Sequence, residues 1–181
     1  ASPYAASDDG SVVVGFGGAT SPSGGFANHG FRWTAGGGFV DLGVLPASPN
    51  GSIYALDCSS DASTIVGYSI VGGVETWNAV IWTQATGWRT LRDILAGQSV
   101  AIPANIVQRE TFVSGDGRVV GGWAYNTTTQ RYKGYYAVLS SGGTCDADAN
   151  DDGNIDQDDV AYVINVVAGG SNPTGFDADF N

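Results

Sequence analysis

Three segments of the chain repeat one pattern, and this internal repeat limits the fold more than any other feature of the sequence. Each segment contains a serine, an aspartate at a turn position, a run rich in β-branched residues and a glycine. The segments are SDDGSVVVGF (7–16), SSDASTIVGY (59–68) and SGDGRVVGGW (114–123). Their turn aspartates, Asp9, Asp61 and Asp116, lie 52 and 55 residues apart. A period of about 50 residues is typical of proteins that stack one supersecondary unit.

The sequence of each repeat predicts a set of short antiparallel strands. Asp-Gly between two alternating runs favours a tight hairpin turn, because both residues tolerate the positive φ that such turns need. Strand-like pieces follow each turn: HGFRWT (29–34), NAVIWT (78–83), KGYYAV (133–138), GFVDLG (38–43) and GWRTLR (87–92). We therefore predict an all-β body over residues 1–144, with three units of about four antiparallel strands arranged like propeller blades or like a β-sandwich.

Three units are fewer than a closed propeller requires, since propellers have about four to eight blades. An open array leaves strand edges whose backbone groups can pair with another chain. We therefore expect either that further repeats precede this sequence or that neighbouring copies cover the edges. The strand at Pro3, Tyr4 and Ala5 begins in the middle of a repeat, so we expect it to be the segment that crosses into a neighbour if the chain assembles.

The repeat resembles a known family. The Ser-x-Asp-Gly-x-Val-Val-Gly run, the aromatic-x-Trp-Thr strand and the Gly-Phe-Val-Asp-Leu-Gly strand are together similar to the HAF repeat of bacterial extracellular proteins, whose tripeptide corresponds to residues 29–31. The resemblance covers about residues 4–140, with Ala62 in place of the turn glycine in the second unit and Ala137 in place of tryptophan in the third. It implies a propeller-like architecture and an extracellular location, without a particular activity.

The acidic charge of the chain is concentrated after residue 144. Residues 145–181 contain nine aspartates and no lysine or arginine, whereas residues 1–144 contain nine acids and seven bases. A nearly neutral body with an acidic tail argues against nucleic-acid binding, which needs basic patches, and against attachment to anionic membranes. No stretch approaches the roughly 18 apolar residues of a membrane-spanning helix. The net charge of −11 therefore favours a cation as partner, with no nucleic acid and no membrane insertion.

The tail sequence DADANDDGNIDQDDV (146–160) fits a calcium-binding loop. Such a loop needs oxygen ligands at positions 1, 3, 5, 7, 9 and 12, with glycine at position 6. With Gly153 at position 6, oxygen donors fill the six ligand positions: Asp148, Asn150, Asp152, Asn154, Asp156 and Asp159. We predict one Ca²⁺ site there, followed by a helix with one apolar face. We expect the tail to be disordered without metal, because its carboxylates repel one another.

A calcium loop followed by one helix, with no helix before it, resembles the dockerin type I repeat of secreted bacterial proteins over residues 146–170. The resemblance implies calcium-dependent docking to a cohesin-like partner. Dockerin domains carry two such repeats, and a second loop starts here with Asp179 and Asn181 at its first and third ligand positions. We expect the natural protein to continue beyond residue 181. The alternative is that Asp177 and Asp179 contact a neighbouring molecule.

The other chemistry-bearing residues favour structural roles. Cys58 and Cys145 are the two cysteines, and in the oxidising compartment that the tail implies they either form a disulfide or stay free. His29 is the only histidine, which excludes multi-histidine zinc sites. No two carboxylates of the body are paired by the pattern, as a glycosidase would require. We therefore expect no catalytic residues.

The tryptophans fall into two groups. Trp33 and Trp82 occupy the same position in successive repeats, and we expect them in the core. Trp77, Trp88 and Trp123 lie nearer turns, where both ordinary packing and stacking on sugar rings remain open.

Three classes of function remain. The first is a non-enzymatic, extracellular structural protein of a bacterial cell surface, which is stabilised by calcium and self-associates with neighbouring copies into a filament or surface layer. The second is a module that binds a polysaccharide or a cohesin-like partner on the cell surface. The third, a fragment of an enzyme, is the least supported, and we expect no enzymatic activity.

Overall fold

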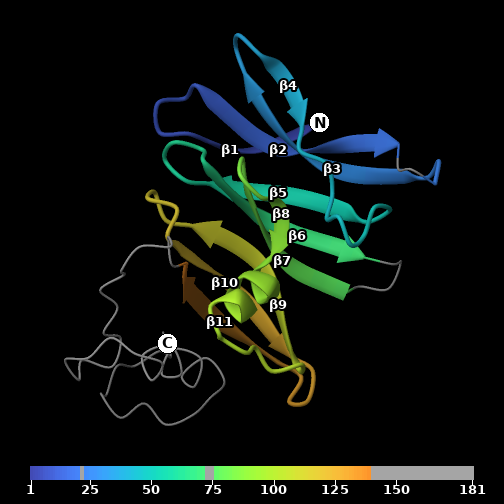
Figure 1. Ribbon diagram of the computed structural model, residues 1–181, viewed down its shortest axis with the longest axis vertical. Coiled ribbons are helices and arrows are strands. Elements are labelled where there is room, and N and C mark those ends of the chain that lie inside the picture. Colours follow the sequence, from blue (N-terminus) through green and yellow to red (C-terminus); the bar gives the residue numbers. More distant parts are fainter. Residues whose placement is uncertain (21–22, 72–75, 140–181) are drawn as a thin grey trace.

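The computed structural model describes residues 1–20, 23–71 and 76–139, which form three antiparallel sheets and one helix (Figure 1). We call the sheets units 1, 2 and 3. Unit 1 contains β1 (Ser2–Ala6), β2 (Val12–Thr20), β3 (Phe26–Thr34) and β4 (Gly38–Asp41). Unit 2 contains β5 (Ser52–Cys58), β6 (Thr64–Val71), β7 (Thr76–Thr83) and β8 (Gly87–Thr90). Unit 3 contains β9 (Ile106–Val113), β10 (Val119–Asn126) and β11 (Arg131–Val138).

The prediction of repeated antiparallel units is confirmed. Units 1 and 2 have the expected four strands, and unit 3 has three strands within the described residues. The strand register repeats as well, since Trp33 pairs with Phe39 in unit 1 as Trp82 pairs with Trp88 in unit 2. The expected calcium loop and helix, at residues 146–170, fall outside the described residues.

The units stack face to face, and the core lies between them. Unit 1 is at the top of Figure 1, unit 2 in the middle and unit 3 at the bottom. One core cluster joins units 1 and 2 and includes Val14, Ile65 and Trp88. A second cluster joins units 2 and 3 and includes Val66 and Val120. Neighbouring residues of a strand point to opposite faces, so β6 supplies side chains to both clusters.

The aspartate of each repeat forms the turn that the sequence predicted. Its Oδ1 accepts one hydrogen bond from the serine Oγ two residues earlier and one from the backbone N–H two residues later. The bonded sets are Ser7–Asp9–Ser11 (2.7 and 2.9 Å), Ser59–Asp61–Ser63 (2.8 and 2.9 Å) and Ser114–Asp116–Arg118 (2.5 and 3.0 Å). The next residue has a positive φ of 68° at Gly10, 53° at Ala62 and 75° at Gly117. Ala62 thus keeps the turn geometry, at a cost of roughly 1–2 kcal/mol.

Backbone hydrogen bonds link these turns from unit to unit. The N–H of Asp8 donates to the carbonyl of Ser60 (2.9 Å), and the N–H of Ser60 donates to the carbonyl of Gly115 (2.8 Å). The three residues occupy the same position in their repeats, so the link between units is itself repeated. The turns accordingly lie one below another along the left side of the stack in Figure 1.

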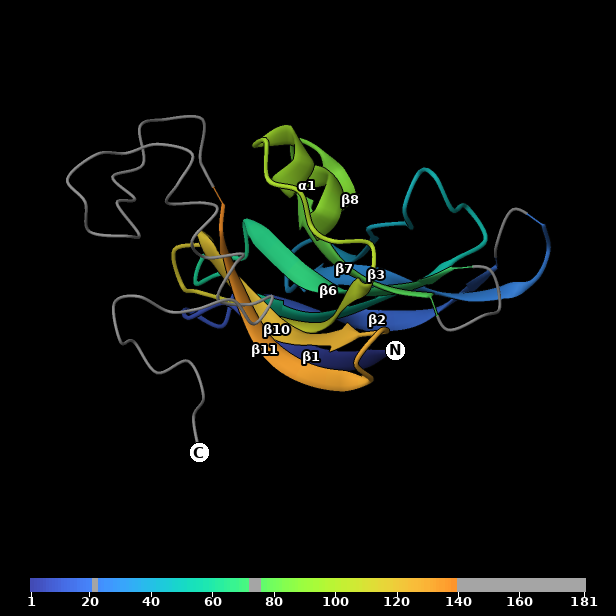
Figure 2. The same cartoon turned by 90° about the horizontal axis from the view of Figure 1, so that it is seen from below.

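A helix that was not predicted from the sequence follows unit 2. α1 (Leu91–Gly97) begins after Thr90, whose Oγ1 accepts a hydrogen bond from the N–H of Asp93 (3.0 Å). Leu91 and Leu95 are buried in the core between units 2 and 3. The helix packs beside β7 and β8, on the opposite side of the stack from β1 (Figure 2). The all-β prediction is wrong here, because the strand ends at Thr90, which caps a helix.

Candidate functional site

Each unit has two faces, and the repeat determines which neighbour each face meets. In β6, Ile65 packs against unit 1 and Val66 packs against unit 3. Val120, the equivalent of Ile65 in unit 3, packs against unit 2, and so does Val14, the equivalent of Val66 in unit 1. We call the face toward the preceding unit the front face and the face toward the following unit the back face. The front face of unit 1 and the back face of unit 3 therefore form the two ends of the described stack.

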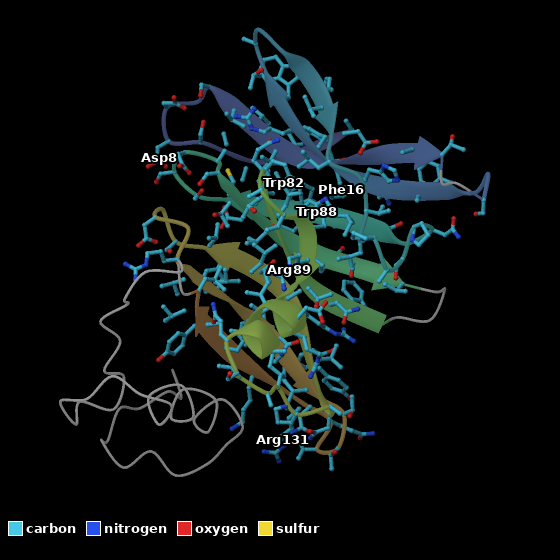
Figure 3. All side chains as sticks on the ribbon, in the orientation of Figure 1. Asp8, Phe16, Trp82, Trp88, Arg89 and Arg131 are labelled. Carbon is cyan, nitrogen blue, oxygen red and sulfur yellow. The ribbon has the colours of Figure 1, made fainter. Side chains whose placement is uncertain are left out.

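The front face of unit 1 exposes an aromatic side chain at a position that is buried in unit 2. Trp88 of unit 2 is 2% exposed, and its ring occupies the space above Gly30 of unit 1. Figure 3 shows Trp88 between the two sheets. Its equivalent in unit 1, Phe39, is 66% exposed. The Phe39 ring rests on Phe31 and Trp33, with ring centroids 5.0 and 6.5 Å apart.

Several large hydrophobic side chains are exposed on the back face of unit 3. Phe112 and Tyr136 flank Gly121 from its two sides, and Trp123 lies two residues further along the same strand, so all three point to one face. The exposed residues of this face, at 38–56%, are Phe112, Trp123, Tyr132, Tyr136 and Val138. Ile81, the equivalent of Tyr136, is buried between units 2 and 3. The same repeat position is thus buried inside the stack and exposed at its end.

Gly30 and Gly134 are equivalent residues with different surroundings. A Cβ on Gly30 would lie 2.6 Å from Cζ2 of Trp88, whereas a Cβ on Gly134 would have no described residue within 4 Å apart from its chain neighbours. Gly30 pairs with Phe16 across its sheet, and Gly134 pairs with Trp123. The back face of unit 3 is therefore open at the point where the back face of unit 1 receives an aromatic ring.

The sequence segments that contain units 1 and 3 differ in net charge. Residues 1–51, which include unit 1, contain three aspartates and one arginine, so their net charge is −2 with His29 neutral. Residues 98–139, which include unit 3, contain four bases and two acids, so their net charge is +2. The four bases are Arg109, Arg118, Arg131 and Lys133.

A row of aromatic side chains crosses the stack from unit 1 to unit 3. Successive ring centroids lie 4.5–5.2 Å apart along Tyr4, Phe16, Tyr54, Tyr68 and Trp77. The guanidinium of Arg109 lies 5.0 Å from the Trp77 ring and extends the row to Tyr125 (5.6 Å) and Tyr132 (5.7 Å). Tyr4 and Tyr132, near the two ends of the row, are more than half exposed.

Cys58 is the one predicted disulfide residue that the structure describes. It is buried in the core between units 1 and 2. Burial, together with the negative charge of Asp57, raises the pKa of its thiol to about 11, so the thiol stays protonated at neutral pH. Cys145 lies outside the described residues, and the disulfide stays a prediction.

The predicted metal ligands and second-loop residues also lie outside the described residues, and the calcium site stays a prediction. They are Asp148, Asn150, Asp152, Asn154, Asp156, Asp159, Asp179 and Asn181. Within residues 1–20, 23–71 and 76–139, no group of three or more His, Cys, Asp or Glu side chains is arranged to hold a metal ion. No helix in those ranges is long and apolar enough to cross a membrane.

The predicted interchain strand lies in its own sheet as β1. Pro3 pairs with Gly15 and Ala5 with Val14 of β2, and the register shifts between the two pairs. Tyr4 stacks on Phe16 with ring centroids 5.2 Å apart. The crossing of this strand into a neighbour stays a prediction, because the structure contains a single chain.

His29 makes a polar contact between two strands of unit 1. Its Nδ1 lies 2.9 Å from Oδ2 of Asp41. Its Nε2 is buried and has no hydrogen-bond partner among the described residues. The contact joins β3 to β4, which suits the structural role expected for this residue.

The tryptophans divide by burial. Trp82 and Trp88 are buried in the core between units 1 and 2, so packing rather than sugar stacking accounts for Trp88. Trp33 and Trp77 are half-buried, and Trp123 is exposed on the back face of unit 3.

The end-face residues were not predicted from the sequence, although the repeat alignment contains the signal. Phe39 aligns with Trp88, and Gly134 aligns with Gly30. The alignment shows that these positions are equivalent. Their difference in burial depends on which unit stands beside them, and that information comes from the structure.

No family model matches this sequence, and no curated protein matches it. Among solved structures, the chain is similar to the putative TolB from Agrobacterium tumefaciens, with a TM-score of 0.47 and 13% identity over 78% of this chain and 45% of that one. It is also similar to the β-propeller domain of the Trilobed protease from Pyrococcus furiosus, with a TM-score of 0.40 and 11% identity over 76% of this chain and 42% of that one. The chain spans less than half the length of either structure, and the likeness is confined to a β-rich fold.

Proposed function

We propose that the chain is a non-enzymatic, extracellular structural protein of a bacterial cell surface, which self-associates through its propeller-like units and is stabilised by calcium bound to its acidic tail. The observation that supports self-association most directly is the back face of unit 3, where five large hydrophobic side chains are 38–56% exposed. A contiguous apolar patch on a protein surface marks a contact with another molecule. Filaments and surface layers are assemblies that use such contacts repeatedly.

The turn aspartates support a function without catalysis. The hydrogen bond from Ser7 lowers the pKa of Asp9 to about 2, and the hydrogen bond from the N–H of Ser63 lowers the pKa of Asp61 to about 2. The serine partner of Asp116 lowers the pKa of that carboxyl as well. A general acid or base works best with a pKa near the operating pH. These carboxylates are instead ionised at neutral pH, and their oxygens accept the hydrogen bonds that form the turns.

Self-association is tested by measuring the mass and shape of the particles that the protein forms in solution. Size-exclusion chromatography with light scattering in calcium is expected to show species larger than the 18.5 kDa chain, and negative-stain microscopy is expected to show arrays. The variant Trp123→Glu/Tyr136→Glu should be monomeric, because it places charges in the apolar contact. Phe26→Glu is the matched control, since Phe26 is 80% exposed on β3 of unit 1. Single chains at every protein concentration would contradict the proposal.

Calcium stabilisation is tested separately. Isothermal titration calorimetry is expected to show one bound Ca²⁺ per chain, and Asp152→Asn should abolish binding because it removes a charged ligand. Asp8→Asn, which removes the same charge from unit 1, should leave binding unchanged. Titration of wild-type protein without a heat of binding would remove calcium from the proposal.

A second candidate, polysaccharide binding, is favoured by the aromatic row from Tyr4 to Tyr132. Half-exposed aromatic rings combine an apolar face with polar edges, which suits stacking on sugar rings. Affinity electrophoresis in gels that contain soluble polysaccharides tests this candidate. Retardation that Tyr4→Ala/Tyr132→Ala abolishes, and that Phe26→Ala leaves unchanged, would favour it. Equal mobility of wild type in gels with and without polysaccharide would exclude it for the glycans used.

A further inference from the structure

We propose that the back face of unit 3 in one molecule binds the front face of unit 1 in a second copy of this chain, with Phe39 of the second copy seated above Gly134 of the first. The inference rests on the proposed self-association. It adds the two surfaces that meet and the direction in which copies follow one another.

The first support is an interface that the molecule already contains. Between units 1 and 2, the ring of Trp88 fills the space above Gly30. Phe39 is the repeat equivalent of Trp88, in the same register against the neighbouring strand. Gly134 is the repeat equivalent of Gly30, and its space is open in the described structure. Contact between two copies therefore continues the arrangement that already joins units within one copy.

The sizes of the side chains fit this contact. Phenylalanine at 39 is smaller than tryptophan at 88, so it fills less of the space above a glycine. On the receiving face, Trp123 is larger than its equivalent Phe16, which pairs with Gly30. The larger receiving ring offsets the smaller inserted ring, which keeps the packing dense, as in protein interiors.

Backbone hydrogen bonding extends in the same direction. Within the chain, the N–H of Asp8 donates to Ser60, and the N–H of Ser60 donates to Gly115. In the next step, the N–H of Gly115 donates to the carbonyl of Asp8 in the second copy. The turns of both copies then form one continuous series.

The pairing joins two different surfaces of the chain, the front face of unit 1 and the back face of unit 3. A contact between two different surfaces is heterologous, and each copy then keeps one free surface for a further copy.

Two variants, each with one blocked end, test the direction. Phe39→Asp places a carboxylate in the apolar contact, and Gly134→Glu fills the open position and places a carboxylate there. Both positions are open to solvent in the single chain, so the urea midpoints should stay close to wild type. Each variant alone is expected to elute as a monomer of 18.5 kDa. An equimolar mixture is expected to give twice that mass, because only one wild-type front and one wild-type back remain to pair.

The outcomes separate this inference from the proposed function. A front-to-front contact would leave Gly134→Glu assembled, and a mixture that stays as single chains while wild type assembles would also overturn the inference; in both cases self-association itself survives. Wild-type protein that never assembles would overturn both. Phe26→Asp is the matched control and should assemble like wild type.

Cross-linking gives a second, independent readout. Benzoylphenylalanine at position 39 should capture residues of β10 or β11 from another molecule, which mass spectrometry of the cross-linked peptides identifies. Capture only of unit 1 peptides would contradict the inference.

Discussion

Trp88 and Phe39 stand at the same repeat position and in the same strand register, yet one is 2% and the other 66% exposed. The difference does not come from residue type, since both side chains are large and aromatic. It comes from the neighbour, because unit 1 covers the front face of unit 2, and the front face of unit 1 stands at the end of the described stack. In a repeat protein, burial therefore reports position in the stack. Phe39 is exposed where its one described equivalent is buried, and this difference is the basis of the proposed contact.

The two aromatic positions should differ strongly in what they contribute to the free energy of unfolding. Trp88→Ala should lower the free energy of unfolding by about 3–5 kcal/mol, because it leaves a cavity in the core between units 1 and 2. Phe39→Ala, its matched control, should change that free energy by less than about 1 kcal/mol in dilute protein, because the ring is mostly in water. Urea unfolding followed by tryptophan fluorescence measures both. Equal losses in the two variants would show that the neighbouring unit does not decide how much each ring contributes to stability.

The two equivalent glycines should differ next. Gly30→Ala should cost about 1–3 kcal/mol of unfolding free energy, because its Cβ would lie 2.6 Å from Trp88. Gly134→Ala should be neutral or slightly stabilising, since no described residue apart from the chain neighbours lies within 4 Å of the new methyl group and glycine is costly in a strand. Thermal unfolding of both variants in dilute solution tests this. A loss at Gly134 as large as at Gly30 would show that its position is not open.

The turn serines of units 2 and 3 should differ in their contribution to stability by a smaller amount. The Oγ of Ser59 accepts a hydrogen bond from the N–H of Thr64 (3.0 Å) and is almost fully buried, so Ser59→Ala should cost about 1–3 kcal/mol. Ser114, the equivalent residue in unit 3, is only half-buried, and water can replace its hydroxyl. Ser114→Ala should therefore cost about half as much or less. Chemical denaturation measures both costs, and equal costs would show that the turn of unit 3 is no better hydrated than that of unit 2.

The weakest effect is on stability at acid pH, to which the turns of units 1 and 2 should contribute alike. The pKa values of Asp9 and Asp61 are lowered from 3.8 to about 2, so both carboxylates stabilise the fold above about pH 4 and lose this contribution as pH falls toward 2. Asp9→Asn/Asp61→Asn keeps an oxygen acceptor but does not titrate, and it should flatten the fall in urea midpoint over this range. Asp8→Asn is the charge control. An unchanged pH profile in the double variant would show that the turns do not contribute.

The parts of the fold that depend on local chemistry were predictable from the sequence. The turns at Asp9, Asp61 and Asp116 followed from one serine, one aspartate and a residue that accepts positive φ. Helix α1 was missed although Thr90 and Asp93 have capping spacing, because GWRTLR aligned with the strand GFVDLG. The end faces could not be predicted, since alignment of repeats shows which residues are equivalent but gives no neighbour for the first and last. The calcium ligands rest on loop spacing and remain a prediction.

The hydrogen bonds between the turns also give the stack a polarity. Every N–H in the series from Asp8 through Ser60 points toward the following unit, and every accepting carbonyl belongs to that unit. An array that continues this series has a donor end and an acceptor end, which differ chemically as the two ends of a polar filament do. Growth rates at the two ends are then independent quantities. A capping molecule that occupies the back face of unit 3 would stop elongation at one end and leave the other free to grow.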